Sequence, residues 1–149
     1  MRKIKFRAKA LESHYTSLDG IEIGDWVYGF YYFDRANLCG VIVTDLEEES
    51  GGVGSGIVQC HIKVDPETVG QYIGLLDKNK EEIYEGDIVK CIPNVEFYRE
   101  VVFIASRYWL INKSINNPDI QFPLEVVNTS HCNSEIIGNI WDNPELVGK

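Results

Sequence analysis

Two adjacent pairs of cysteine and histidine are the residues of this chain that most resemble metal ligands. Cys60 precedes His61, and His131 precedes Cys132. Thiolates and imidazoles are the usual ligands of zinc, which takes four of them in a structural site. Neighbouring residues on a strand point to opposite faces, so Cys60 and His61 cannot both reach one ion. Because closely spaced ligand pairs are also missing, we expect buried thiols, surface histidines and neither a metal nor another cofactor.

The glycine-rich stretch 51–56 suggests a phosphate loop or an exposed nucleophile, and its residues exclude both. A phosphate loop needs Lys-Ser/Thr after its last glycine, and neither residue type follows Gly56. A nucleophile elbow around Ser55 needs glycines where Val53 and Ile57 stand. The histidines lie in separate segments, and no carboxylate stands in an apolar context that would raise its pKa. We therefore expect no catalytic residue and no enzymatic activity.

Basic residues gather at the N-terminus of an otherwise acidic chain. Residues 1–9 hold five of the 14 basic groups and no acid, and the chain has a net charge of −9. Such a charge is unfavourable for binding duplex DNA, because DNA-binding proteins gain affinity by neutralising phosphates. A basic edge on an acidic body can instead steer a protein partner, including a second copy of the chain. The candidate interaction residues are Arg2, Lys3, Lys5 and Arg7.

The same basic segment allows an alternative interpretation. Small β-barrels bind single-stranded nucleic acid with a basic groove and with aromatic rings on which bases stack. Phe6 lies within the basic segment, and Tyr31 or Trp109 could supply further rings. The aromatic residues are, however, numerous enough to be needed in the core, and the body is acidic. Single-stranded nucleic-acid binding through the N-terminal strand is therefore kept as the alternative to protein binding.

Hydrophobic residues recur with a period of two along most of the chain, which is the pattern of β-strands. With 149 residues, 44% of them hydrophobic, the chain can bury a sizeable core. The predicted fold class is mainly β, with strands of the small SH3-like barrel type and one or two short helices. Strand patterns cover 3–9, 21–33, 39–44, 57–64, 82–92, 97–105, 107–112, 120–127 and 135–141.

Two local signals divide this pattern. Asp65 followed by Pro66 predicts the start of a short helix, because Asp caps the first turn and Pro fits the first helical position. Residues 45–56 are acidic and then almost entirely Gly and Ser, which predicts a flexible loop. We expect one domain over residues 1–149, with candidate sub-lobes over 1–64 and 65–149.

The pattern Gly-Asp-x-Val occurs twice, at 24–27 and at 86–89. Glycine can take the backbone angle that a tight corner needs, and the aspartate side chain can accept hydrogen bonds from the turn amides. The two windows therefore predict the same kind of corner before a strand. Structural roles are expected for Gly24, Asp25, Gly86, Asp87 and Val89.

The block 64–89, which contains Asp65, Pro66 and the second Gly-Asp corner, resembles the signature of the YopX family, small proteins of temperate phages and prophages of Gram-positive bacteria. Residues 4–8 and 135–146, the latter with Gly138 and Asn139, are similar to the two ends of the family. The resemblance implies structural roles for these residues, self-assembly, and no assigned activity.

One residue departs from the family pattern. Family members typically have glycine after the Asp-Lys-Asn turn, where this chain has Lys80. We therefore expect a type of turn that needs no positive φ at this position.

Together these observations predict a non-enzymatic, homo-oligomeric binding protein that acts on a host or phage protein. The longest apolar run, 26–33, is far shorter than the roughly 18 residues that span a bilayer, so no membrane partner is expected. The basic N-terminus lacks the apolar core of a signal peptide, and the four cysteines form no CxxC pair. These features favour a location of the protein in the cytoplasm of a bacterial host.

Overall fold

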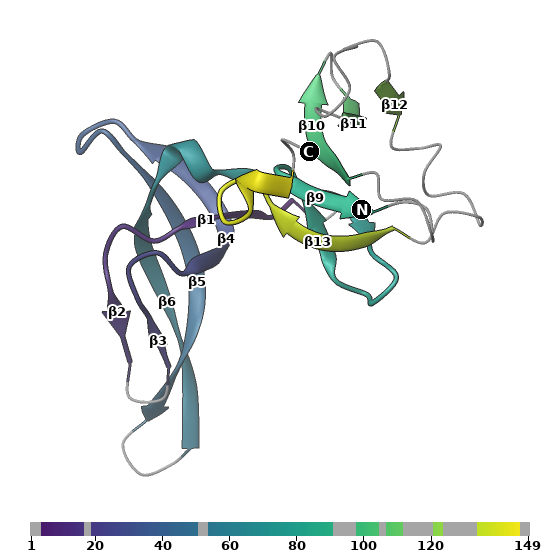
Figure 1. Ribbon diagram of the computed structural model, residues 1–149. Coiled ribbons are helices and arrows are strands. Elements are labelled where there is room, and N and C mark those ends of the chain that lie inside the picture. Colours follow the sequence, from purple (N-terminus) through teal and green to yellow (C-terminus); the bar gives the residue numbers. More distant parts are fainter. Residues whose placement is uncertain are drawn as a thin grey trace. The chain divides into compact units, whose positions relative to one another are not determined.

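The chain is mainly β, as its period-two pattern predicts, and Figure 1 shows it as a computed structural model. The strands are joined by loops and by two single-turn 3₁₀ helices within the described residues. Two compact units divide the chain, unit 1 (Met1–Gln71) and unit 2 (Tyr72–Lys149), so the boundary follows residue 71 rather than residue 64. The structure describes residues 4–16, 19–50, 54–90, 98–104, 107–111, 121–123 and 134–146.

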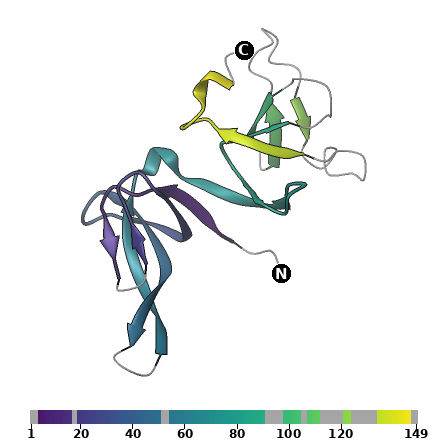
Figure 2. The same cartoon turned by 60° about the horizontal axis from the view of Figure 1, so that its bottom comes forward.

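Unit 1 is built on one antiparallel sheet with the strand order β6-β5-β4-β1-β7. Two further short strands, β2 and β3, pair with each other. The hairpin of β5 and β6 extends well beyond the other strands of the unit in both views (Figures 1 and 2). The elements are β1 (Phe6–Lys9), β2 (His14–Tyr15), β3 (Gly20–Ile21), β4 (Trp26–Asp34), β5 (Cys39–Ser50), β6 (Gly54–Val64), the 3₁₀ helix η1 (Pro66–Thr68) and the first residues of β7 (Gly70–Leu76).

Alternation along these strands sends apolar side chains to one face of the sheet, which forms the core of unit 1. Ile42 on β5 and Ile62 on β6 lie directly opposite each other and are fully buried. Ile21 of β3 belongs to the same cluster, so the small hairpin helps to cover this face. The cluster comprises Ala8, Ala10, Ile21, Val27, Ile42, Leu46, Cys60, Ile62 and Val64.

A single bridge brings the chain after β1 back to the end of β6. Ala10 pairs with Val64, and the Leu11 N–H donates to the carbonyl oxygen of Lys63 at 2.8 Å. The sheet therefore curls at this end. Within the described residues, the backbone hydrogen bonds that join the chain after β1 to the end of β6 run between residues 9–11 and residues 63–65.

The predicted loop over 45–56 is wrong for most of its length. Residues 45–50 belong to β5 and 54–56 to β6, and the pairing of the two strands runs on to Ser50 opposite Gly54. Residues 51–53 lie outside the described residues. A hairpin arm is held by backbone hydrogen bonds to its neighbour, which the Gly and Ser composition of a segment does not reveal.

The predicted helix start is confirmed as the single turn η1. The Asp65 carboxylate accepts the Glu67 N–H at 2.9 Å, and Pro66 is the first residue of the turn. The Thr68 hydroxyl then accepts the N–H of Lys9 at 2.9 Å and donates to the carbonyl oxygen of Asp65 at 2.8 Å. These bonds attach η1 to β1.

Unit 2 contains a five-stranded antiparallel sheet with the order β12-β11-β10-β9-β13, and the later residues of β7 pair with β8. The strands predicted over 82–92 flank the Gly86 corner but belong to different pairings, because β8 pairs with β7 and β9 with β10 and β13. The elements are β8 (Glu82–Tyr84), β9 (Asp87–Lys90), β10 (Tyr98–Ile104), β11 (Arg107–Ile111), β12 (Gln121–Pro123), β13 (Glu135–Asn139) and the 3₁₀ helix η2 (Pro144–Leu146).

The core of unit 2 is smaller and lies beside a buried carboxylate. It comprises Ile73, Ile83, Val89, Val101 and Leu110. Asp77, only 7% exposed, directly follows β7 and accepts three backbone N–H groups: those of Asn79 at 2.7 Å, Glu81 at 2.9 Å and Ile136 at 3.2 Å. Because Ile136 lies on β13, this one side chain joins the β7–β8 turn to the five-stranded sheet.

Lys80 lies in this turn with a φ of +70°, so the expectation of a turn without a positive φ is wrong. Asp77 and Glu81 close the turn, because the Asp77 N–H donates to the Glu81 carbonyl at 2.8 Å. The Lys80 N–H also returns to the Asp77 carbonyl oxygen, at 3.0 Å. So tight a reversal leaves Lys80 in the left-handed region, where a Cβ atom is disfavoured.

We predict that Lys80→Gly stabilises the protein by about 1 kcal/mol, because glycine adopts this φ without steric cost. The midpoint of urea unfolding should rise while its slope stays the same. Lys80→Ala is the matched control: it removes the charged side chain but keeps the Cβ, so it should not stabilise. Equal stabilisation by both substitutions would contradict the backbone explanation.

Candidate functional site

The two Gly-Asp corners have the same geometry. Gly24 and Gly86 have φ values of +91° and +82°. The aspartate that follows each glycine accepts the backbone N–H three residues earlier: Asp25 that of Glu22 at 2.8 Å, and Asp87 that of Tyr84 at 2.7 Å. Asp87 is only 1% exposed, whereas Asp25 is exposed. These residues shape the backbone before β4 and β9.

A tryptophan lies against the second corner only. A Cβ added at Gly86 would overlap the indole ring of Trp141, while one added at Gly24 would meet nothing within 4 Å. Asn139 positions the tryptophan, because its side-chain oxygen accepts the N–H groups of Trp141 at 3.1 Å and Asp142 at 2.9 Å. The family motif at Gly138 and Asn139 is thus part of the turn that places Trp141.

Comparing alanine at the two corners separates backbone strain from ring packing. Gly24→Ala should cost about 1–2 kcal/mol, the penalty of a left-handed residue with a Cβ. Gly86→Ala should cost about 1–3 kcal/mol more, because the methyl group also displaces Trp141. Thermal unfolding of both variants measures the difference, and an equal loss would show that Trp141 adapts freely.

The basic N-terminal strand lies against aromatic rings of β4. Within β1 and β4, Arg7 is opposite Tyr28 and Lys9 is opposite Trp26. The guanidinium carbon of Arg7 lies 4.6 Å from the centroid of the Trp26 ring, and the Lys9 Nζ lies 5.1 Å from it. The Nζ of Lys5 lies 5.4 Å from the Tyr28 centroid. Each distance is within the range of a cation–π interaction.

Arg7 differs from the solvated residue that the alternation of 3–9 predicts. It is only 6% exposed, whereas Lys5 and Lys9 are half-buried. Among the candidate interaction residues, Arg2 and Lys3 lie outside the described part of the chain. Arg7 therefore contributes to the packing of the sheet and offers little surface to a partner.

The aromatic row continues along β4 on the same side. Tyr28, Phe30 and Tyr32 alternate along the strand and are 41%, 60% and 37% exposed. The Tyr32 hydroxyl lies 3.3 Å from Nδ1 of His61, and the two rings meet edge to face. His61 is on β6, so this contact crosses β5.

We call this side of the unit 1 sheet the basic–aromatic face. It is opposite the core and combines exposed rings with ammonium groups from both ends of the sheet. Its basic and aromatic members are Lys5, Arg7, Lys9, Trp26, Tyr28, Phe30, Tyr32, His61 and Lys63. By the same registers, Asp34, Val41, Val43, Asp45 and Gln59 also lie on this side.

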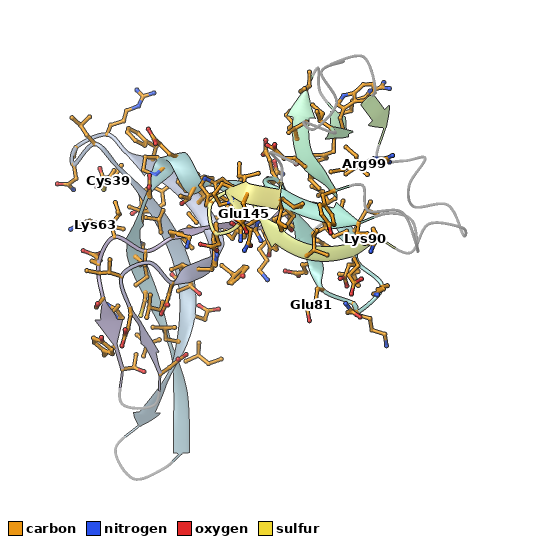
Figure 3. All side chains as sticks on the ribbon, viewed as in Figure 1. Cys39, Lys63, Glu81, Lys90, Arg99 and Glu145 are labelled. Carbon is orange, nitrogen blue, oxygen red and sulfur yellow. The ribbon has the colours of Figure 1, made fainter. Side chains whose placement is uncertain are left out.

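Lys63 forms the border of this face with a short ion pair. Its Nζ lies 3.1 Å from Glu12 Oε2, and its backbone N–H donates to Glu12 Oε1 at 3.2 Å; Figure 3 labels Lys63 and the neighbouring Cys39. Burial acts to raise the pKa of Glu12, but the hydrogen bonds and charge of Lys63 outweigh it and the net pKa is lowered. The hydrogen bond and charge of Glu12 raise the pKa of Lys63.

The lowered pKa of Glu12 predicts a pH-dependent contact at the end of β6. A carboxyl group whose pKa is lowered by folding stabilises the folded state fully at pH values above its unfolded pKa. This stabilisation is lost as the pH falls through the pKa of the group in the folded state. Amide-exchange protection of Lys63, measured as a protection factor, should therefore fall on acidification through this range. In Glu12→Gln the protection should not change with pH over the same range; a persistent change would assign the effect to another group.

The structure separates several residues that the sequence placed together. Cys60 is buried and His61 is exposed, on opposite faces of β6, and the described residues contain no group of metal-ligating side chains.

Tyr31 packs on the core side of unit 1, where burial raises its pKa. Trp109 belongs to unit 2 and donates to the Ile104 carbonyl oxygen at 3.0 Å. His131 and Cys132 lie outside the described residues.

Sequence reasoning did not select the row of Tyr28, Phe30 and Tyr32, although a signal was present. The alternation of 26–33 places these residues on one side of a strand, and Tyr31 and Phe33 on the other. What the alternation does not reveal is which side is covered by the core.

Comparison with known proteins shows a family and a fold. The family model described as "YopX protein" matches residues 5–148. Among solved structures, protein EF1440 from Enterococcus faecalis is similar, with a TM-score of 0.56, 22% sequence identity and 99% of each chain covered. No curated protein matches the chain. A search of the described residues for helices that could cross a membrane found none.

Proposed function

This chain belongs to the YopX family, and we propose that it is a non-catalytic binding protein that holds a protein partner on its basic–aromatic face. Family membership by itself names neither a partner nor a reaction. The proposal therefore depends on the chemistry of this face.

The observation that supports the proposal most is the exposed row of rings on β4. Tyr28, Phe30 and Tyr32 stand at alternate positions on a paired strand, so their spacing is held by the sheet. Phe30 leaves 60% of its surface in water. Exposed aromatic residues cost hydration free energy, and grouped ones are typical of protein interfaces, where rings bury a large area with little loss of side-chain entropy.

The charge of the face favours an acidic partner. Lys5 and Lys9 lie over the rings at one end of the row, where the described residues of this side are basic, whereas Asp34 and Asp45 share the side nearer β5 and Lys63 is paired with Glu12. The positive charge is therefore concentrated beside Trp26 and Tyr28, although the chain as a whole has a net charge of −9. A positive patch on a negative protein attracts acidic surfaces and orients the encounter. A host or phage protein with an acidic surface has this chemistry.

Single-stranded nucleic acid is the second candidate, because the face combines cations with rings. Three features weigh against it. Lys5, Arg7 and Lys9 already lie over the rings of Tyr28 and Trp26, so these rings are less available to bases. Arg7 is buried, which keeps its guanidinium from phosphates. The net charge of −9 repels a polyanion.

A capture experiment with two matched variants tests the proposal. The tagged protein, Phe30→Ser and Phe33→Ser are incubated with lysate of a bacterial host, with and without nuclease, and the bound material is identified by mass spectrometry. The two phenylalanines lie on one strand and are 60% and 48% exposed, but they face opposite sides. We expect a nuclease-resistant protein whose recovery falls about tenfold or more in Phe30→Ser only.

The other outcomes would overturn this function. Equal recovery by the wild type and both variants would place the contact elsewhere. Bound material that disappears with nuclease, and is also lost in Lys5→Glu, would establish nucleic-acid binding instead. Thermal unfolding of each variant shows whether a loss comes from misfolding.

A further inference from the structure

The outer edge of β6 borders the basic–aromatic face, and His61 and Lys63 belong to both. β6 is the end strand of its sheet, and it is 11 residues long. An end strand presents a row of backbone N–H and C=O groups that can pair with another strand. The question is therefore which residues point outward along this edge, and what could pair with them.

The bridge to the chain after β1 identifies the outward residues. The Lys63 carbonyl oxygen accepts the Leu11 N–H, and the Lys63 N–H donates to the Glu12 carboxylate. The backbone N–H and C=O groups of Lys63 therefore point away from β5. Because backbone groups alternate along a strand, those of His61, Gln59 and Ile57 also point away from β5. No hydrogen bond to these outward groups is found among the described residues.

The sequence and register of this stretch lack the features that usually protect an edge, although the β2–β3 hairpin lies beside β6 and covers its core side (Figures 1 and 2). Natural sheets keep their edges from pairing with proline, with charged side chains, especially lysine, or with bulges. Between Ile57 and Ile62 there is no proline, lysine, arginine or carboxylate. The pairing of β5 with β6 is regular through this stretch, and Ile57 is 76% exposed. Lys63 is the first charged residue after this stretch, and there Leu11 and Glu12 already occupy the edge.

We propose that β6 pairs through residues 57–61 with β6 of a second copy, antiparallel and about a twofold axis at Gln59. Gln59 then lies opposite the partner's Gln59, and Ile57 opposite the partner's His61. Each of these outward pairs exchanges both backbone hydrogen bonds. On the core side, Val58 lies next to the partner's Cys60.

The second copy is favoured over another chain because the edge is self-complementary in this register. The twofold places an apolar residue beside a histidine ring and a neutral amide beside its own equivalent, so no like charges face each other. The register is also limited in one direction, because Leu11 and Glu12 occupy the edge at Lys63. The inference does not rest on the function proposed for the basic–aromatic face, although the two surfaces share His61.

Proline at position 59 tests the pairing directly. The Gln59 N–H points away from β5, so Gln59→Pro removes a donor of the edge while leaving the donors of the hairpin intact. Gln59→Ala is the matched control, because it removes the side chain and keeps the N–H. We expect the wild type and Gln59→Ala to dimerise in sedimentation equilibrium, and the dissociation constant of Gln59→Pro to rise at least about tenfold. Circular dichroism establishes that the strands remain in Gln59→Pro.

A cross-link checks the register. Paired residues of this kind have Cα atoms about 5.5 Å apart, within the range of a disulfide. Gln59→Cys should therefore form a covalent dimer on mild oxidation, above the level of the wild type with its own cysteines. Ile57→Cys is the control, because the two copies of position 57 would lie roughly 14 Å apart.

The remaining outcomes overturn the inference. A wild type that stays monomeric up to high concentration excludes the pairing, and a monomer that captures another protein through a Gln59→Pro-sensitive contact assigns the edge to that protein. A dimer that survives Gln59→Pro and is lost in Phe30→Ser uses the basic–aromatic face instead. More efficient cross-linking of Ile57→Cys than of Gln59→Cys contradicts the register.

Discussion

Aspartate side chains that accept backbone N–H groups hold the corners on which this β structure depends. Short strands require frequent reversals, and each reversal leaves amide donors that the sheet cannot pair. Asp25 and Asp87 each accept one such donor after a glycine of positive φ, and Asp77 accepts three, one of them from β13. Without Asp87 the buried N–H of Tyr84 would cost about 1–3 kcal/mol, whereas the exposed N–H of Glu22 could pair with water if Asp25 were absent.

The same alternation that builds the core of unit 1 also builds its possible contact surfaces. Apolar residues on one side of β4, β5 and β6 form the cluster around Ile42 and Ile62. The other side is left with rings and cations, which stabilise each other where Arg7 and Lys9 lie over Trp26. The edge of β6 differs in kind, since it offers backbone groups rather than side chains. The face and the edge of this sheet therefore differ in the groups they offer, and His61 is a residue that they share.

Most strands follow from local patterns, and the exceptions have identifiable reasons. The strand within 21–33, its Gly-Asp corner and the capped turn at Asp65 depend on neighbouring residues, and all three are present. The arm over 45–56 does not follow from composition, because its order comes from pairing with the opposite strand. Lys80 has a left-handed backbone because Asp77 closes the turn around it, and no property of lysine announces that.

Local sequence patterns predicted the mainly-β class, the Gly-Asp corners, the start of η1 and the opposite orientation of Cys60 and His61. Each of these depends on period-two alternation or on turn chemistry, which act over a few residues. The burial of Arg7, the exposure of Phe30 and the place of β6 at the end of its sheet do not follow from these local patterns. These properties depend on which strand lies beside which, and strand order is set by contacts between residues far apart in the chain.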